Sequence, residues 1–156
     1  MTHLIEGDKA PFFSTVSHNS EEISLDSFKG KKIILYFYPK DNTPGCTAEA
    51  CNLRDNYAWL TAHNFIVIGV SPDSDASHNK FSAKHDLPFY LIADVDKEIL
   101  KAYGAWGLKK LYGKEYEGVI RTTFIINEDG FIQNIITKVK TKEHTQQIID
   151  LLNIED

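Results

Sequence analysis

The chain has 156 residues, which is long enough to bury a core, and residues 1–156 are expected to form a single domain. Hydrophobic residues make up 42% and charged residues 25% of the chain, as in ordinary globular proteins. A net charge of −5 argues against nucleic acid or an anionic membrane as partner, and no apolar run approaches the ~18–20 residues of a membrane span.

The predicted elements follow an α/β order. Residues 12–16 and 22–25 flank a polar turn and predict an N-terminal hairpin. Apolar runs predict the other strands, at residues 32–38, 65–71, 88–92, 121–126 and 131–137. Caps and periodicity predict a single helical turn at 26–30 and helices at residues 44–63, 73–86, 96–103 and 141–152. Residues 104–118 are predicted to be irregular, and the whole order predicts a mixed central sheet flanked by helices.

Apolar spacing also predicts which helical side chains face the core. The residues expected to point inward are Leu53, Tyr57, Leu60, Phe81, Ile148, Leu151 and Leu152.

Both cysteines lie in one stretch, residues 39–51, which reads P-K-D-N-T-P-G-C-T-A-E-A-C. Thr43 is a good N-cap residue and Pro44 suits the first helical position, so Cys46 falls in the first turn of a helix. Free N–H groups and the helix dipole stabilise a thiolate there, and the thiolate is the nucleophilic form of cysteine. Cys46 is therefore a candidate reactive sulfur. The alternative is that it packs as a small apolar residue.

Cys51 follows Cys46 by five residues. On one ideal helix their Cα atoms would be about 8.6 Å apart, whereas a disulfide needs roughly 4.4–6.8 Å. Either the two cysteines never pair, or pairing requires the first turns of the helix to unwind. A switchable disulfide therefore fits this spacing better than a static one.

The pattern Pro39-x-x-x-Thr43-x-x-Cys46 resembles the active-site signature of peroxiredoxins. The position of Cys51 is similar to that in the bacterioferritin-comigratory-protein (peroxiredoxin Q) subgroup. A second segment, residues 112–126, resembles the part of these proteins that carries an active-site arginine. The resemblance covers nearly the whole chain and implies a thioredoxin-like α/β fold with an N-terminal β-hairpin.

The resemblance also implies a thiol peroxidase that reduces hydrogen peroxide and organic hydroperoxides. Cys46 would attack the O–O bond and become a sulfenic acid. Cys51 would condense with it to an intramolecular disulfide, which a thioredoxin-type donor would reduce. Thr43 and Arg121 would hydrogen-bond the peroxide oxygens and the thiolate, and Pro39 would shield the sulfur from water. The subgroup further implies a monomer.

Each of these residues also has an ordinary structural interpretation. Arg121 could be a surface ion-pair residue, and Thr43 could act only as a helix cap. Glu49 lies one turn after Cys46, on nearly the same face of the helix. A carboxylate there would oppose a thiolate, so it would be useful only by holding Arg121 in place. The alternative for Glu49 is a solvated side chain.

Metal and cofactor binding are not expected. None of the six histidines shows a metal-ligand spacing with a cysteine or another histidine, and all six are expected on the surface. Four aromatic residues near the second segment could wall the site, but ordinary packing is expected for most of them: Trp106, Tyr103, Tyr112 and Tyr116. The polar N-terminus lacks a signal-peptide pattern, and two cysteines suit a reducing compartment, so a cytoplasmic location is expected.

Two other functions remain open. A general thiol-disulfide oxidoreductase could share the fold, but the chain has no C-x-x-C motif and no proline at the start of the strand at 121–126. A non-enzymatic binding module would have thiols that are inert to peroxide. The physiological reductant and the preferred peroxide cannot be read from the sequence.

Overall fold

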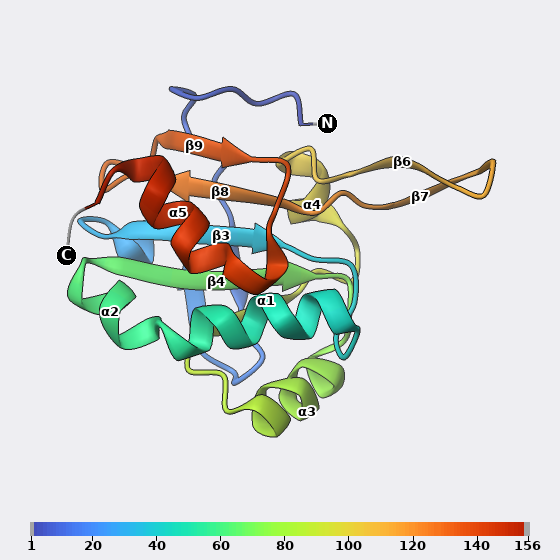
Figure 1. Cartoon of the computed structure of the whole chain (residues 1–156), viewed down its shortest axis with the longest axis horizontal. Helices are drawn as coiled ribbons and strands as arrows, with labels where there is room; N and C mark the ends of the chain where they lie inside the picture. The colour runs from blue at the N-terminus through green and yellow to red at the C-terminus, as the bar shows by residue number, and fades with distance from the viewer. Residues whose placement is uncertain (1, 155–156) are drawn as a thin grey trace.

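A computed structural model describes residues 2–154 of the chain. At its centre is a five-stranded sheet (Figure 1). In order across the sheet, the strands are β5 (Tyr90–Ala93), β4 (Phe65–Ser71), β3 (Lys32–Phe37), β8 (Thr122–Ile126) and β9 (Ile132–Ile136). β4 runs parallel to β3 and β5, whereas β8 runs antiparallel to β3 and β9. The predicted mixed sheet is therefore confirmed.

Helices and two small strand pairs surround this sheet. The helices are α1 (Pro44–Asp55), α2 (Tyr57–Ala62), α3 (Asp75–His85), α4 (Glu98–Ala102) and α5 (His144–Leu152), with short 3-10 helices at Leu25–Phe28 and Thr141–Glu143. The pairs are the predicted N-terminal hairpin of β1 (Ser14–Val16) and β2 (Glu22–Ser24), and a second hairpin of β6 (Trp106–Leu111) and β7 (Lys114–Val119). Among the helices of residues 2–154, none combines the length and apolar character needed to cross a membrane.

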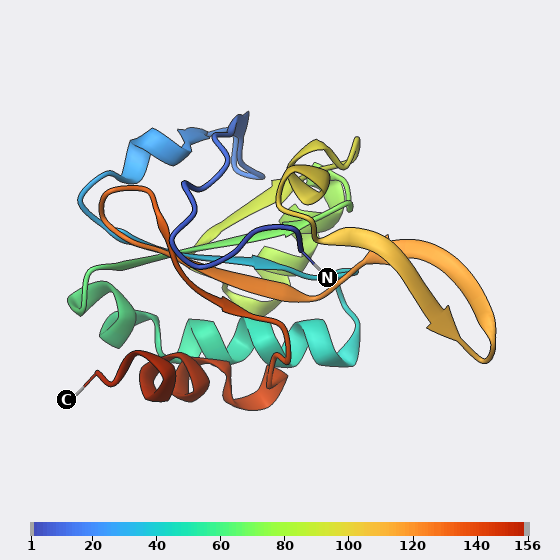
Figure 2. The same cartoon turned by 90° about the horizontal axis from the view of Figure 1, so that it is seen from above.

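The sheet is buried on both faces, which explains the unbroken apolar runs of its central strands. In β3, Ile34 and Tyr36 pack in a cluster with side chains of α1, α2, α3 and α5. Their neighbours Leu35 and Phe37 point to the opposite face, where the N-terminal segment and α4 cover them. Figure 2 shows α1 and α5 together on one side of the sheet. Alternate side chains therefore enter separate apolar layers.

Strand register brings the two sequence motifs to one end of the sheet. Phe37 at the end of β3 lies opposite Thr122 at the start of antiparallel β8. The chain leaves β3 through the loop at 38–43 and enters α1, while Arg121 directly precedes β8. The antiparallel pairing thus places the start of α1 and Arg121 next to each other.

The prediction that residues 104–118 are irregular is wrong. Most of this segment forms the β6–β7 hairpin, which projects from the body of the molecule (Figures 1 and 2). Its turn places Tyr112 and Gly113 at φ angles of 51° and 78°, a conformation that glycine adopts readily. Because most side chains of both strands are at least partly exposed, the sequence lacks the apolar alternation that marks a half-buried strand.

The single helix predicted for residues 44–63 is divided in two at Asn56. The side-chain amide of Asn56 donates to the carbonyl of Asn52 at 2.8 Å, and such local bonds compete with the helical pattern. Leu53 and Leu60 are nevertheless fully buried, as expected, whereas Tyr57 is half-buried. In α5, Ile148 is buried but Leu151 is 44% exposed, so the inward orientation predicted for Leu151 is wrong.

Candidate active site

Cys46 occupies the third position of α1. Pro44 is the first residue of that helix and Thr43 is its N-cap, as the sequence predicts. The Thr43 side chain makes no capping bond, however, and its hydroxyl donates to the carbonyl of Lys40 at 2.9 Å. The hydroxyl therefore braces the loop, and the N–H groups of the first turn keep their capacity to bind a negative charge.

The sulfur of Cys46 is buried against a cation. The residue is only 1% exposed, and Nη2 of Arg121 donates to its Sγ at 3.2 Å. The guanidinium also lies close to Gly45, where a Cβ atom would be 3.4 Å from the same nitrogen, an ordinary van der Waals distance. The guanidinium is therefore in direct contact with the sulfur.

Glu49 holds the other side of the guanidinium. Its Oε1 accepts a hydrogen bond from Nη1 of Arg121 at 2.6 Å, and its side chain is fully buried. Burial raises the pKa of Glu49 to about 7, although the nearby Arg121 opposes the shift. Burial lowers the pKa of Arg121, but Glu49 and Cys46 outweigh it and hold that pKa above its usual value. The solvated alternative for Glu49 is therefore wrong.

His144 is a residue of this site that sequence reasoning missed. It is fully buried at the start of α5, with Nε2 at 3.5 Å from Oε2 of Glu49 and 2.9 Å from Oγ1 of Thr123. Burial lowers the pKa of His144 to about 4. A signal was available, because His144 precedes the core residue Ile148 by four positions and so shares its helix face.

The expectation that all six histidines lie on the surface is therefore wrong. His18 and His78 are buried as well as His144. Nδ1 of His78 lies 2.7 Å from Oδ2 of Asp41, and its Nε2 lies 3.0 Å from the carbonyl oxygen of Ile92. Tyr38 donates a further hydrogen bond to Asp41 at 2.7 Å. These bonds anchor the loop between β3 and α1 to α3.

Asp41, Asp73 and His78 also place one potential metal ligand each within 4.8 Å of one another. Hydrogen bonds already engage these atoms, since Oδ2 of Asp73 accepts from the backbone N–H of Asp41 and from the hydroxyl of Ser71. Burial opposes ionisation of Asp41, but its bonds to His78 and neighbouring hydroxyls outweigh burial and hold its pKa below the usual value. The cluster is accounted for as a structural anchor.

Cys51 lies on the same helix as Cys46, and both thiols are free. Cys51 is half-buried and faces α3, where Nδ1 of His85 lies 3.7 Å from its Sγ. The two sulfurs therefore have different surroundings. Because α1 is intact, they are in the arrangement that cannot form a disulfide without unwinding.

The remaining residues considered for the site are Pro39 and the aromatic residues of the second segment. Pro39 is half-buried in the anchored loop before α1. Tyr103 is fully buried in the core on the other face of the sheet, against Phe37 and Phe124. Tyr112 is 95% exposed at the hairpin turn and cannot form a wall of the site.

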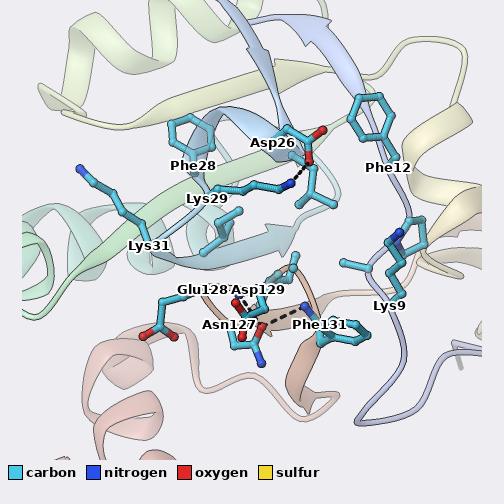
Figure 3. Close-up of a pocket in the computed structure, with 16 residues that line it drawn as sticks. Lys9, Phe12, Asp26, Phe28, Lys29, Lys31, Asn127, Glu128, Asp129 and Phe131 are labelled. Atoms are coloured by element: carbon cyan, nitrogen blue, oxygen red, sulfur yellow. Dashed lines mark hydrogen bonds and ion pairs between the residues drawn. The ribbon is translucent and has the colours of Figure 1, made fainter.

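A pocket of about 600 Å³ lies at the opposite end of the central strands (Figure 3). Ile33 at the start of β3 and Ile126 at the end of β8 line it, together with the turn at 127–131. The ion pair of Lys29 with Asp26 lies at its edge. Neither cysteine lines this pocket, so the thiol chemistry is separate from it.

The sequence is similar to a known protein family and to several of its members. The model of the AhpC/TSA family matches residues 6–135. A putative peroxiredoxin bcp from Coxiella burnetii is 45% identical over 146 residues, which cover 94% of this chain and 97% of the relative. Peroxiredoxin Bcp from Bacillus subtilis is 44% identical over 146 residues, covering 94% and 93% of the two chains.

Solved structures give the same result. A mutant of PrxQ from Xylella fastidiosa superposes with a TM-score of 0.91 at 30% identity, covering 98% of each chain. A bacterioferritin comigratory protein from Xanthomonas campestris, described for its alkyl peroxide reduction activity, superposes with a TM-score of 0.84 at 30% identity, covering 90% of each chain.

Proposed function

Since this chain belongs to the AhpC/TSA family and is a thiol-dependent peroxidase with the thioredoxin-like fold of the peroxiredoxins, we propose that Cys46 is the sulfur that attacks the peroxide. The hydrogen bond from Arg121 to Sγ of Cys46 is the observation that carries this assignment. It gives Cys46 a charge partner of a kind that a merely structural cysteine does not need.

The thiolate of Cys46 attacks one oxygen of the peroxide, so that an S–O bond forms and the O–O bond breaks. The products are a sulfenic acid on Cys46 and an alkoxide or hydroxide, which takes a proton and leaves as alcohol or water. Arg121 and the N–H groups of the first turn are the donors available to the developing negative charge. In this proposal Thr43 also hydrogen-bonds a peroxide oxygen, and Pro39 shields the sulfur from water.

Cys51 resolves the sulfenic acid in this proposal. Its thiol condenses with the sulfenic sulfur of Cys46, which forms an intramolecular disulfide and releases water. Because the two cysteines begin on one intact helix, the first turns of α1 unwind before the S–S bond forms. A thioredoxin-type donor then reduces the disulfide to two thiols.

Location and assembly are also part of the proposal. The spacing of the two cysteines does not suit a static disulfide, as expected in the reducing cytoplasm. We propose that the protein works there as a monomer, in keeping with the subgroup that it resembles.

The first test is to react the reduced protein with one equivalent of hydrogen peroxide and to follow intact mass and peptide maps over seconds. We expect rapid loss of two hydrogens and a peptide link between Cys46 and Cys51 within one chain. The Cys46→Ser variant should consume no peroxide. The Cys51→Ser variant should form the sulfenic acid but fail to be recycled by a thioredoxin. Thiols of the wild-type protein that stay unchanged would overturn the proposal.

A further inference from the structure

Cys51 is held against a histidine from a different helix. Sγ of Cys51, in the middle of α1, lies 3.7 Å from Nδ1 of His85, the last residue of α3. The two helices lie next to each other in Figure 1. This is a thiol–imidazole pair within hydrogen-bonding distance for sulfur, and the attack assigned to Cys46 does not use it.

The imidazole of His85 is directed at the sulfur alone. Its Nε2 is buried and has no hydrogen-bond partner within residues 2–154. Its ring packs edge-to-face on Phe81 of the same helix, with ring centroids 5.2 Å apart. The sulfur of Cys51 is thus the polar side-chain contact of this ring among the described residues.

An arginine lies beside the pair. Nη1 of Arg54, on α1, donates to the backbone carbonyl of His85 at 2.8 Å. The pKa of Arg54 is raised chiefly by its hydrogen bond to Asp55, with further contributions from Cys51 and Asp86. The charged groups that face the pair are therefore Arg54, its partner Asp55, and Asp86 at the end of α3. Arg54 therefore links α1 to the backbone of His85 beside the pair.

We propose that His85 is a catalytic residue of the resolving step, in which it acts as the general base for Cys51. Nδ1 accepts the thiol proton as the sulfur of Cys51 attacks the sulfenic sulfur of Cys46. The S–S bond forms while the S–O bond breaks. The departing hydroxide takes a proton from solvent to become water, and His85 returns the thiol proton to solvent. The net change is one thiol and one sulfenic acid to one disulfide and one water. This inference rests on the proposed peroxidase cycle.

The same contact predicts which part of α1 moves. The contacts of Arg54 and Cys51 with His85 hold the C-terminal half of α1 against α3. Cys46 is the third residue of α1 and lies outside that half. If the turns before Cys51 unwind, Cys46 can approach while Cys51 stays beside its base. His85 thus keeps the resolving sulfur in place and activates it.

The test separates the two half-reactions. The wild-type protein and His85→Gln are mixed with peroxide, quenched at intervals with a reagent that traps sulfenic acid, and analysed by mass. We expect equal rates of sulfenic acid formation on Cys46, and disulfide formation near pH 7 that is slower in His85→Gln by about 100-fold or more. The difference should shrink near pH 10, at which a free thiol ionises without help.

Two controls distinguish base catalysis from a change in structure. His63→Gln alters another half-buried histidine at a helix end and should leave both rates unchanged. In His85→Ala, free imidazole added to the buffer should restore much of the lost rate. Resolution by His85→Gln at the wild-type rate, or a slow rate that neither imidazole nor high pH restores, would overturn the role of His85. A wild-type protein that forms no sulfenic acid would instead overturn the proposed function.

Discussion

Arg121 stands between two groups that compete for its charge. Nη2 donates to the sulfur of Cys46 and Nη1 donates to Glu49. The ionised form of Glu49 binds the guanidinium more strongly than the neutral form, because a hydrogen bond between charged groups is about twice as strong as a neutral one. At the residue scale, the protonation of Glu49 therefore decides how firmly Arg121 is aimed at the sulfur.

We expect this dependence to appear in the pH profile of peroxide reduction. The pKa of Glu49 is raised by burial to about 7, so the carboxylate that holds Arg121 is gained as pH rises through that value. Glu49→Gln keeps a hydrogen-bond acceptor but removes the titration. Stopped-flow oxidation by hydrogen peroxide should be close to wild type near pH 6 and about tenfold slower near pH 8, a loss of ~1.4 kcal/mol. A ratio that is the same at both pH values would contradict this role of Glu49.

The contact between Glu49 and Arg121 is only partly predictable from the sequence. Glu49 was predicted to lie on the face of Cys46 because helical spacing is local, and α1 confirms that placement. Whether it contacted Arg121 depended on a residue 72 positions away, which sequence spacing cannot specify. His144 was assigned to the surface because its buried position depends on how α5 packs against α1.

Among the helices, α1 must be folded for one step of the proposed cycle and partly unwound for the next. Its folded first turn places Cys46 beside Arg121, yet its unwinding is needed to bring Cys46 to Cys51. Contacts with neighbouring elements restrain it, since Nδ2 of Asn52 donates to the carbonyl of Lys142 and its Oδ1 accepts from the N–H of Thr145. These bonds hold the C-terminal half of α1, so the stability of its first turns, which unwind before the S–S bond forms, should contribute to the rate of resolution.

Ala48→Gly tests this coupling. Ala48 is half-buried between the two cysteines, and glycine in a helix interior costs about 1 kcal/mol relative to alanine. The unwound population should rise about fivefold. We expect disulfide formation after oxidation to speed up by a similar factor, measured by the quenched mass assay.

The matched control is Ala58→Gly, which makes the same change at an exposed position of α2. It should lower the free energy of unfolding without changing the rate of disulfide formation. Equal acceleration in both variants would show that general destabilisation, and not unwinding of α1, is responsible.

For the whole molecule, α5 links stability to pH through His144. Burial lowers the pKa of His144 to about 4 from the ordinary 6.5. Between these values the unfolded chain binds more protons than the folded one, so His144 costs stability as pH falls from about 6.5 to 4. Glu49 has the opposite sign, because burial raises its pKa from 4.5 to about 7 and folding is favoured as pH falls through that window.

Removing His144 should expose the contribution of Glu49. On going from pH 7 to pH 5, the free energy of unfolding of His144→Gln should rise by about 2 kcal/mol relative to that of the wild-type protein. This difference does not depend on how much the substitution itself destabilises the fold. Urea denaturation at the two pH values measures this difference. His3→Gln, at an exposed histidine, should show no such change. Parallel pH dependence of wild type and His144→Gln would mean that His144 does not titrate in this range.

The elements that short-range patterns specify were predictable from the sequence alone. The strands at 65–71 and 32–38, the placement of Cys46 in a first helical turn, and the separation of Cys46 from Cys51 all follow from periodicity, capping residues and helix geometry. The β6–β7 hairpin was missed because its exposed strands carry no such pattern.

The tertiary structure alone decided which distant side chains meet. Arg121 reaches Cys46 because β3 and β8 are antiparallel with Phe37 opposite Thr122. His85 reaches Cys51 because α3 packs beside α1, and Asp41 binds His78 for the same reason. These contacts span tens of residues along the chain, so they depend on strand register and on the burial of apolar layers. Local geometry can therefore be predicted from the sequence, whereas the contacts of Cys46 and Cys51 depend on the packing of those layers.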